Sequence, residues 1–342
     1  MEVQRPRRNV RAIVLQLALA SFGLAVIGRV VYRIGLDDVM AALARTAPII
    51  PVVFLLDGAR IGCDAWSTRL LLGERGKAIP WWVLFGGQVV GHGVMNVFPA
   101  GRSASEAVKA GLFHRYLGAA EAIAMGASNQ ANTLFSSAVF SLVCAGAAAI
   151  AMPDARLIGA IVIHFVVLMI AGVGMRLAAT NPTVEAFFAR RLPRVGAHLT
   201  RFAARSRETP VVAWGPVGAM VLGRLAQTAE YAVLAIAVGI SMGPLEALAV
   251  QGLNLVSAAI GVLIPGQLGS SEAIFAMASE ALGTDEASAV TIALAAHVAA
   301  LTWAVIGFSL LFVWRHHDPP ASARESVADD ASTGGAPDPG ST

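Results

Sequence analysis

Ionisable side chains interrupt the apolar stretches of this chain, and their spacing predicts a shared polar cavity. Asp57, Arg60 and Asp64 are three and four residues apart, which places them on one face of a helix. Arg224 and Glu230 lie in a later apolar stretch. Charged groups at membrane depth cost about 2.5–3.5 kcal/mol each on insertion scales, so they usually face an interior or a wet cavity. We therefore expect these groups to line such a cavity.

Arginine in a cavity suits phosphate or another anionic group, because the guanidinium group can donate two parallel hydrogen bonds to it. We therefore expect Arg60 and Arg224 to contact an anionic ligand. Asp64 and Glu230 are candidates for ion coupling. The alternative is that the acidic residues form internal ion pairs that fix helix packing, and the sequence leaves both interpretations open.

Two motifs in the chain are nearly the same. Residues 97–107 (VFPAGRSASEA) and 263–273 (LIPGQLGSSEA) align without a gap at an offset of 166 residues. Each is an apolar run that breaks at Pro and Gly and restarts as a short helix. Polar positions outside the motifs match at the same offset, namely Asp64 with Glu230 and Gln88 with Asn254. In a membrane protein, paired broken apolar segments indicate a transport pathway.

The short helix of the first motif carries Arg102, Glu106 and Lys109 on one face. Ser103 or Ser105 could cap its first turn, and the exposed amides of a helix N-terminus favour an anion. The second motif lacks basic residues at the corresponding positions, so the first motif is the better candidate for an anionic headgroup. The alternative for the Ser and Glu residues of both motifs is helix capping without a ligand role.

These patterns predict three sets of site residues. The expected substrate contacts are Arg60, Arg102, Ser105, Glu106, Lys109, Arg224, Asn254 and Glu272. The expected helix breaks, which would form a gate, are Pro99, Gly101, Pro265, Gly266 and Gly269. The candidates for ion coupling are Asp64 and Glu230.

The composition is that of a membrane protein. Hydrophobic residues make up 56% of the chain and charged residues 14%, whereas a soluble domain is typically about 25% charged. The mean hydropathy is +0.67. Six runs are long enough to cross a hydrocarbon core. They are Ala12–Val31, Ile49–Leu72, Thr133–Met152, Leu157–Leu177, Val211–Ile240 and Ala287–Val313.

The two motifs are predicted to be re-entrant hairpins, each of which enters and leaves the membrane on one face. With the arginine-rich N-terminus in the cytoplasm, the basic segments 73–80 and 180–210 and the C-terminus also fall there, as the positive-inside rule requires. Three full crossings separate the motifs, so one hairpin enters from each face. The predicted fold is an all-α polytopic membrane protein with about six transmembrane helices and two oppositely oriented re-entrant helical hairpins in an inverted repeat.

The domain organisation follows from these spans. We expect a basic cytoplasmic N-terminus (1–10), an integral membrane domain (11–317, with repeat 1 at about 48–178 and repeat 2 at about 211–314) and a disordered tail (318–342). A cleaved signal peptide is the alternative for the N-terminus, with a weak cleavage site at Ala18–Ala20. The apolar run continues past this site, which favours a retained anchor helix.

Other function classes lack support in the sequence. H-E-x-x-H, G-x-S-x-G and Walker motifs are absent, so no enzyme or cofactor is predicted. The two cysteines, Cys63 and Cys144, lie in apolar runs and predict neither a disulfide framework nor a metal site. The pI near 9.2 comes from arginines whose bias in a membrane protein indicates orientation rather than nucleic-acid binding.

Residues 93–102 (GVMNVFPAGR), 264–273 (IPGQLGSSEA) and 281–283 (ALG) resemble the lysylphosphatidylglycerol synthase transmembrane region, a flippase-like domain that also occurs as a stand-alone protein. The second motif is the more specific one, through Pro265, Gly266, Gly269 and Glu272. The first motif has a Ser-Ala-Ser stretch where Gly-Asp/Glu is common in the family. The resemblance implies movement of a charged phospholipid between leaflets, without the lysine transfer of the bifunctional members.

The expected function is translocation of an amphiphilic lipid, with an anionic headgroup or of the polyprenyl type, by alternating access between the repeats. The alternatives are an ion-coupled secondary transporter of a small solute and a non-transporting subunit of a lipid-modifying complex. The expected partners are a membrane lipid and a lipid-synthesis enzyme. The expected location is the bacterial cytoplasmic membrane.

Overall fold

A computed structural model describes residues 28–29, 32, 35–98, 100–183, 186 and 212–314. All regular structure in these residues is helical, which confirms the all-α prediction. Most of the predicted first span, both basic termini, the tail, most of the 180–210 connection and Pro99 lie outside the described residues.

The described helices include several of membrane-spanning length. Their bounds are α2 (Leu36–Thr46), η1 (Ala47–Ile49), α3 (Ile50–Leu72), α4 (Glu74–Lys77), α5 (Trp81–Val97), α6 (Gly101–Leu117), α7 (Ala119–Ala151), α8 (Ala155–Thr180), α11 (Trp214–Ala237), α12 (Pro244–Ile260), η3 (Pro265–Gln267), α13 (Ser270–Met277) and α14 (Glu286–Trp314). In the described part, four stretches are long and apolar enough to cross a membrane, namely Leu36–Leu72, Glu121–Ala151, Ala155–Thr180 and Glu286–Phe312. The protein is therefore a multi-pass membrane protein. The predicted span Val211–Ile240 corresponds to α11, which runs from Trp214 to Ala237.

The helices before and after α8 form two sets with the same order. The first set is α3, α5, α6 and α7, and the second is α11, α12, α13 and α14. α3 packs on α11, its counterpart in the second set. α5 packs on α14, and the counterparts of these two helices, α12 and α7, also pack on each other. The two sets therefore contact each other through corresponding helices.

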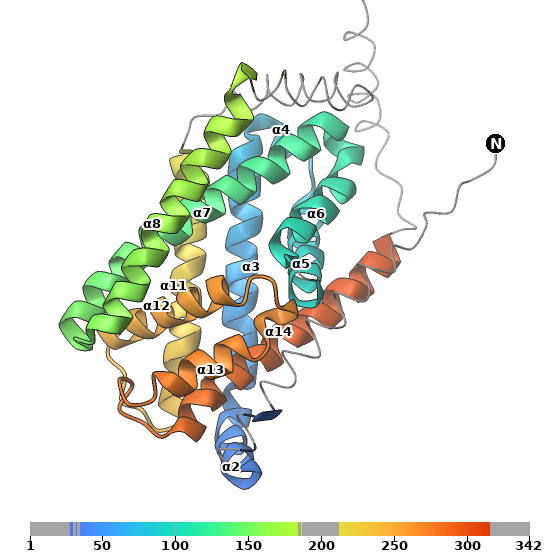
Figure 1. The fold of residues 1–342 in the computed structure, drawn as a ribbon. Helices are drawn as coiled ribbons and strands as arrows, with labels where there is room; N and C mark the ends of the chain where they lie inside the picture. The colour runs from blue at the N-terminus through green and yellow to red at the C-terminus, as the bar shows by residue number, and fades with distance from the viewer. Residues whose placement is uncertain are drawn as a thin grey trace, which may run out of the picture.

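The helix pairs α5–α6 and α12–α13 occupy the positions of the two predicted hairpins. In Figure 1 the α5–α6 pair extends from the end of the molecule that carries α4, whereas α12–α13 extends from the opposite end. The two tips meet, because a Cβ atom on Gly266 of η3 would lie 2.9 Å from the backbone oxygen of Asn96 in α5. Residues of both tips are thereby placed at the interface of the two helix sets.

Left-handed backbone conformations mark both tips. Ala100 has φ 50° immediately before α6, and Gly266 and Gln267 of η3 have φ 62° and 58°. Non-glycine residues seldom adopt this region. The prediction that Ser103 or Ser105 caps this helix is wrong. α6 begins at Gly101, its N-cap residue is Ala100, and no side chain forms a capping hydrogen bond. Both serines therefore lie inside the helix rather than at its start.

The start of α6 leaves no room for a side chain at Gly101, since a Cβ atom there would collide with the backbone of Met95. We predict that Gly101→Ala lowers the free energy of unfolding by about 1–3 kcal/mol, as overpacking does. The matched control is Gly111→Ala in the same helix, where nothing lies within 4 Å of the new Cβ atom. Alanine there should stabilise the helix by up to about 1 kcal/mol.

Unfolding of the detergent-purified variants, followed by tryptophan fluorescence, measures this difference. A Gly101→Ala variant as stable as Gly111→Ala would contradict the tight packing of the hairpin tip against α5.

Candidate functional site

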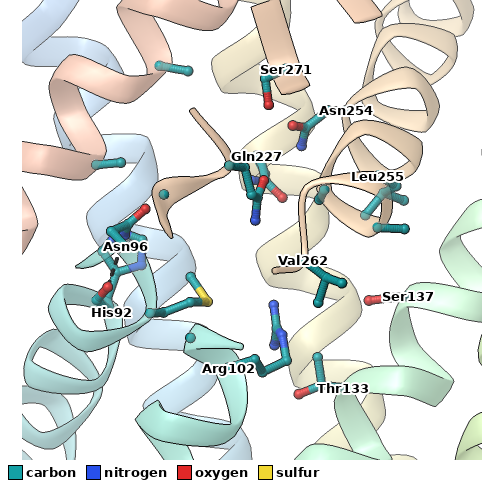
Figure 2. A pocket seen from close by; sticks show the side chains of 18 of the residues that line it. His92, Asn96, Arg102, Thr133, Ser137, Gln227, Asn254, Leu255, Val262 and Ser271 are labelled. Carbon is teal, nitrogen blue, oxygen red and sulfur yellow. Dashed lines mark hydrogen bonds between the residues drawn. The ribbon is translucent and has the colours of Figure 1, made fainter. Parts of the chain in front are cut away.

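A polar cavity of about 280 Å³ lies between the two helix sets. Its wall includes residues of α3, α5, α6, α7, α8, α11, α12, α13 and α14. Figure 2 shows the Arg102 side chain pointing from α6 into this space, with Thr133, Gln227 and Val262 around it. The ionisable residues that line the cavity are Asp57, Arg60, His92, Arg102, His164, Arg224, Glu230, Tyr231 and His297.

Asp57 and Arg60 form a buried ion pair, as their three-residue spacing on α3 permits. Arg60 Nε donates to Asp57 Oδ1 at 2.8 Å, and Arg60 Nη2 lies 2.6 Å from the same oxygen. The Arg60 and Asp57 side chains are only 11% and 5% exposed. Asp64 Oδ2 is farther from the guanidinium group, at 3.8 Å from Nη1. Arg60 thus reaches the cavity with its charge already balanced by a carboxylate.

His92 of α5 completes this cluster. Its Nδ1 atom lies 3.1 Å from Arg60 Nη2. Because arginine can only donate, Nδ1 accepts in this contact. The amide Nδ2 atom of Asn96, one turn further along α5, lies 3.2 Å from His92 Nε2. His92 Nε2 lies 3.5 Å from Asp57 Oδ2, so the ring joins both members of the ion pair.

Arg102 and Arg224 differ from Arg60 in that they have no ion-pair partner. In the described part of the chain, no carboxylate lies within ion-pair distance of either arginine. Arg224 donates to two neutral oxygens, Gln227 Oε1 at 2.9 Å and Ser137 Oγ at 2.8 Å. These two guanidinium groups give the cavity an excess of positive charge. The chemistry suits an anion that can accept several charge-assisted hydrogen bonds.

Three predicted substrate contacts, Ser105, Glu106 and Lys109, line a smaller pocket of about 40 Å³ rather than the main cavity. Lys109 is buried, and its Nζ atom donates to Glu106 Oε1 at 2.6 Å and to Gln88 Oε1 at 2.9 Å. The bond to Gln88 ties α6 to α5 within the first hairpin, and the bond to Glu106 lies within α6. Asp64 lines the same small pocket.

Glu272 is fully buried and does not line the cavity. Its Oε2 atom accepts a hydrogen bond from the Gly269 backbone N–H at 2.7 Å, which is the capping role that the sequence left open. Its Oε1 atom lies 2.9 Å from His297 Nδ1 of α14. Glu272 therefore holds the tip of the second hairpin against α14, and His297 reaches the cavity.

The remaining predicted residues lie at or beside the cavity. Asn254 lines it and accepts a hydrogen bond from Tyr231 Oη at 2.8 Å. Of the predicted helix breaks, Gly101 and Gly266 line the cavity, and Pro265 and Gly269 are buried in the second tip.

The cavity reaches the surface beside the second tip. Ala259 and Val262 line the cavity and are exposed, and their neighbours Ile260 and Leu263 are exposed as well. Ser103, inside α6, also lines the cavity and is exposed. The rim is therefore apolar along the end of α12, and exposed apolar patches of this kind mark contact with membranes or partners.

His92, His164 and Tyr231 line the cavity although the sequence indicated no role for them. Each has its hydrogen-bond partner on another helix. His164 Nδ1 of α8, for example, lies 2.9 Å from Ser141 Oγ of α7. Spacing along one helix cannot reveal such partners, so no sequence signal could have found the two histidines. In the described residues, no group of His, Cys, Asp and Glu could hold a metal ion.

The family model described as Lysylphosphatidylglycerol synthase TM region matches residues 13–308, which include both hairpins and every residue that lines the cavity. No curated protein matches the chain. No solved structure matches it either.

Proposed function

The chain belongs to the lysylphosphatidylglycerol synthase TM region family, a membrane domain related to lipid flippase-like function, and we propose that it moves a lipid with an anionic headgroup between the leaflets. The headgroup would enter the polar cavity while the acyl chains stay in the bilayer. The observation that carries this proposal is the presence of Arg102 and Arg224 in the cavity without a carboxylate partner in the described residues. No chemical step is part of the proposal.

The dimensions of the cavity favour a headgroup over a whole lipid. Ligand pockets usually measure about 300–1,000 Å³, and this cavity measures about 280 Å³. The exposed apolar rim at Ile260, Val262 and Leu263 would let acyl chains remain outside. Both features support an amphiphilic substrate rather than a soluble one.

Alternating access would come from the two helix sets acting as an inverted repeat. The support is that the hairpins extend from opposite ends of the molecule (Figure 1) and meet at Gly266 and Asn96. Arg75 and Lys77 of α4 lie at the end from which the first hairpin extends. The positive-inside rule would place that end in the cytoplasm of a bacterium.

In this proposal Arg102 and Arg224 would bind the headgroup directly, with Arg60 and Asn254 beside them. Ser105, Glu106 and Lys109 would contribute from the small pocket of the first hairpin, and Glu272 would act by holding the second tip. Hinge movement at the two tips would open the cavity to either side.

A leaflet-resolved assay tests the proposal. Proteoliposomes would carry fluorescent phosphatidylglycerol, which is anionic, or fluorescent phosphatidylcholine, which has no net charge. The protein should accelerate the movement of phosphatidylglycerol relative to protein-free liposomes, and do so more than for phosphatidylcholine. Failure to accelerate either lipid would contradict the proposal. Equal acceleration of both would contradict the anionic headgroup, and transport of soluble anions alone would favour the small-solute alternative.

A further inference from the structure

Glu230 of α11 is a buried carboxyl group to which none of the described residues donates a hydrogen bond. It is 3% exposed and lines the cavity, and its Oε2 atom has no partner in the described structure. The nearby donors are engaged elsewhere, Arg60 with Asp57 and Tyr231 with Asn254. An ionised carboxylate in this position would be strongly disfavoured, whereas a protonated one carries no charge and has an O–H to donate.

The equivalent carboxyl group of the first helix set has the opposite environment. Asp64 matches Glu230 at the offset of 166 residues. Its side chain is 36% exposed, and Arg60 Nη1 lies 3.8 Å from Oδ2. Water and a cation both suit an ionised carboxylate. Two equivalent acidic positions thus have unlike surroundings in this conformation, as expected if an alternating-access cycle exchanges those surroundings.

The charges in the cavity connect Glu230 with an anionic headgroup. Asp57 balances Arg60, so Arg102 and Arg224 provide the excess positive charge. An ionised Glu230 would cancel one of these two charges, and a protonated Glu230 leaves both available. The other titratable groups around the cavity are His92 of α5, His164 of α8, Tyr231 of α11 and His297 of α14, with Glu272 of α13 behind His297. α7 and α12 contribute neutral side chains.

We infer that Glu230 binds a proton together with the anionic headgroup, so that the cavity takes up both cooperatively and releases both when Glu230 becomes exposed. The proton comes from water and returns to water, and no covalent bond of the lipid changes. The inference rests on the proposed function and adds the coupling ion and its site. By thermodynamic linkage, the proton and the headgroup must each raise the affinity of the cavity for the other by the same factor.

Equilibrium binding of fluorescent phosphatidylglycerol to the purified protein across a range of pH tests the coupling. Wild-type affinity should fall by up to about tenfold per pH unit once Glu230 ionises, because one proton is linked to binding. Glu230→Gln should lose this dependence and keep tight binding at high pH, since glutamine resembles the neutral acid. The matched control Glu280→Gln makes the same change at an exposed glutamate outside the cavity, so it should keep the wild-type dependence. The same pH dependence in Glu230→Gln would assign it to the histidines and overturn the inference.

Infrared spectroscopy of the reconstituted protein gives a readout that needs no added lipid. Wild type and Glu280→Gln should show the carbonyl stretch of a protonated carboxylic acid, and Glu230→Gln should lack it. An unchanged band in Glu230→Gln would overturn the inference. If the band behaves as expected but no anionic lipid binds at any pH, the proposed function fails while the proton site stands. If lipid binds equally well at every pH, the coupling fails while the proposed function stands.

Discussion

Arg102→Ala is expected to weaken binding of an anionic lipid by roughly 10- to 150-fold, because a hydrogen bond to a charged group contributes about 1.5–3 kcal/mol. Its guanidinium group points into the cavity (Figure 2) and has no carboxylate partner in the described residues. Its removal therefore leaves no unpaired carboxylate behind. Arg224→Ala should also weaken binding. In addition it removes a donor from Ser137 and one of the two donors from Gln227, whose Oε1 atom still accepts from Gln251. Equilibrium binding of fluorescent phosphatidylglycerol to the detergent-purified protein measures both effects.

Arg156→Ala is the matched control, because it removes the same charge from the exposed start of α8, outside the cavity. It should bind the lipid as wild type does. Arg102→Lys keeps the charge but loses the planar fork of donors, so it should restore binding only in part. If Arg102→Ala binds as tightly as Arg156→Ala, the cavity arginine does not contact the headgroup and the proposed function loses its main support.

Contacts within one helix could be predicted from the sequence. The spacing of Asp57, Arg60 and Asp64 predicted a shared face, and the two ion pairs among them confirm it. Helix geometry alone brings residues three and four apart together. The Pro/Gly motifs also predicted where the hairpins turn, since proline and glycine break helices. The tips between α5 and α6 and between α12 and α13 lie at those motifs.

Contacts between helices could not be predicted in the same way. Lys109 bonds to Gln88 of α5, which is a partner set by the packing of the hairpin and not by spacing within α6. His92 depends in the same way on Arg60 of α3. The left-handed conformation of Ala100 carries no signal in its residue type, because only the surrounding packing selects it.

Asp57→Asn is expected to lower the free energy of unfolding by about 3–5 kcal/mol, the usual cost of leaving one member of a buried ion pair unpaired. Asparagine has nearly the shape of aspartate, so the loss reports the missing charge rather than a void. Among the described carboxylates, Asp64 at 3.8 Å would be the one left within ion-pair distance of Arg60. Unfolding by a denaturing detergent in mixed micelles, followed by tryptophan fluorescence, measures the change.

The chain offers a matched control for burial in the pair Glu74 and Lys77. In this pair, as in Asp57 and Arg60, the two residues are three positions apart in one helix. The N–O distance is 2.7 Å for Lys77–Glu74 and 2.6 Å for Arg60–Asp57. The Lys77 and Glu74 side chains are 65% and 86% exposed. Since exposed pairs contribute only about 0.2–1 kcal/mol, Glu74→Gln should cost no more than that.

Removing both charges of the buried pair separates electrostatics from packing. The double variant Asp57→Asn/Arg60→Gln leaves no unpaired charge from the pair, so it should regain part of the stability that Asp57→Asn loses. His92, which lies 3.1 Å from Arg60, keeps neutral amide groups as its neighbours in this variant. A double variant no more stable than Asp57→Asn would show that the loss comes from packing around α3. The cavity wall would then depend on the shape of these side chains and not on their charge.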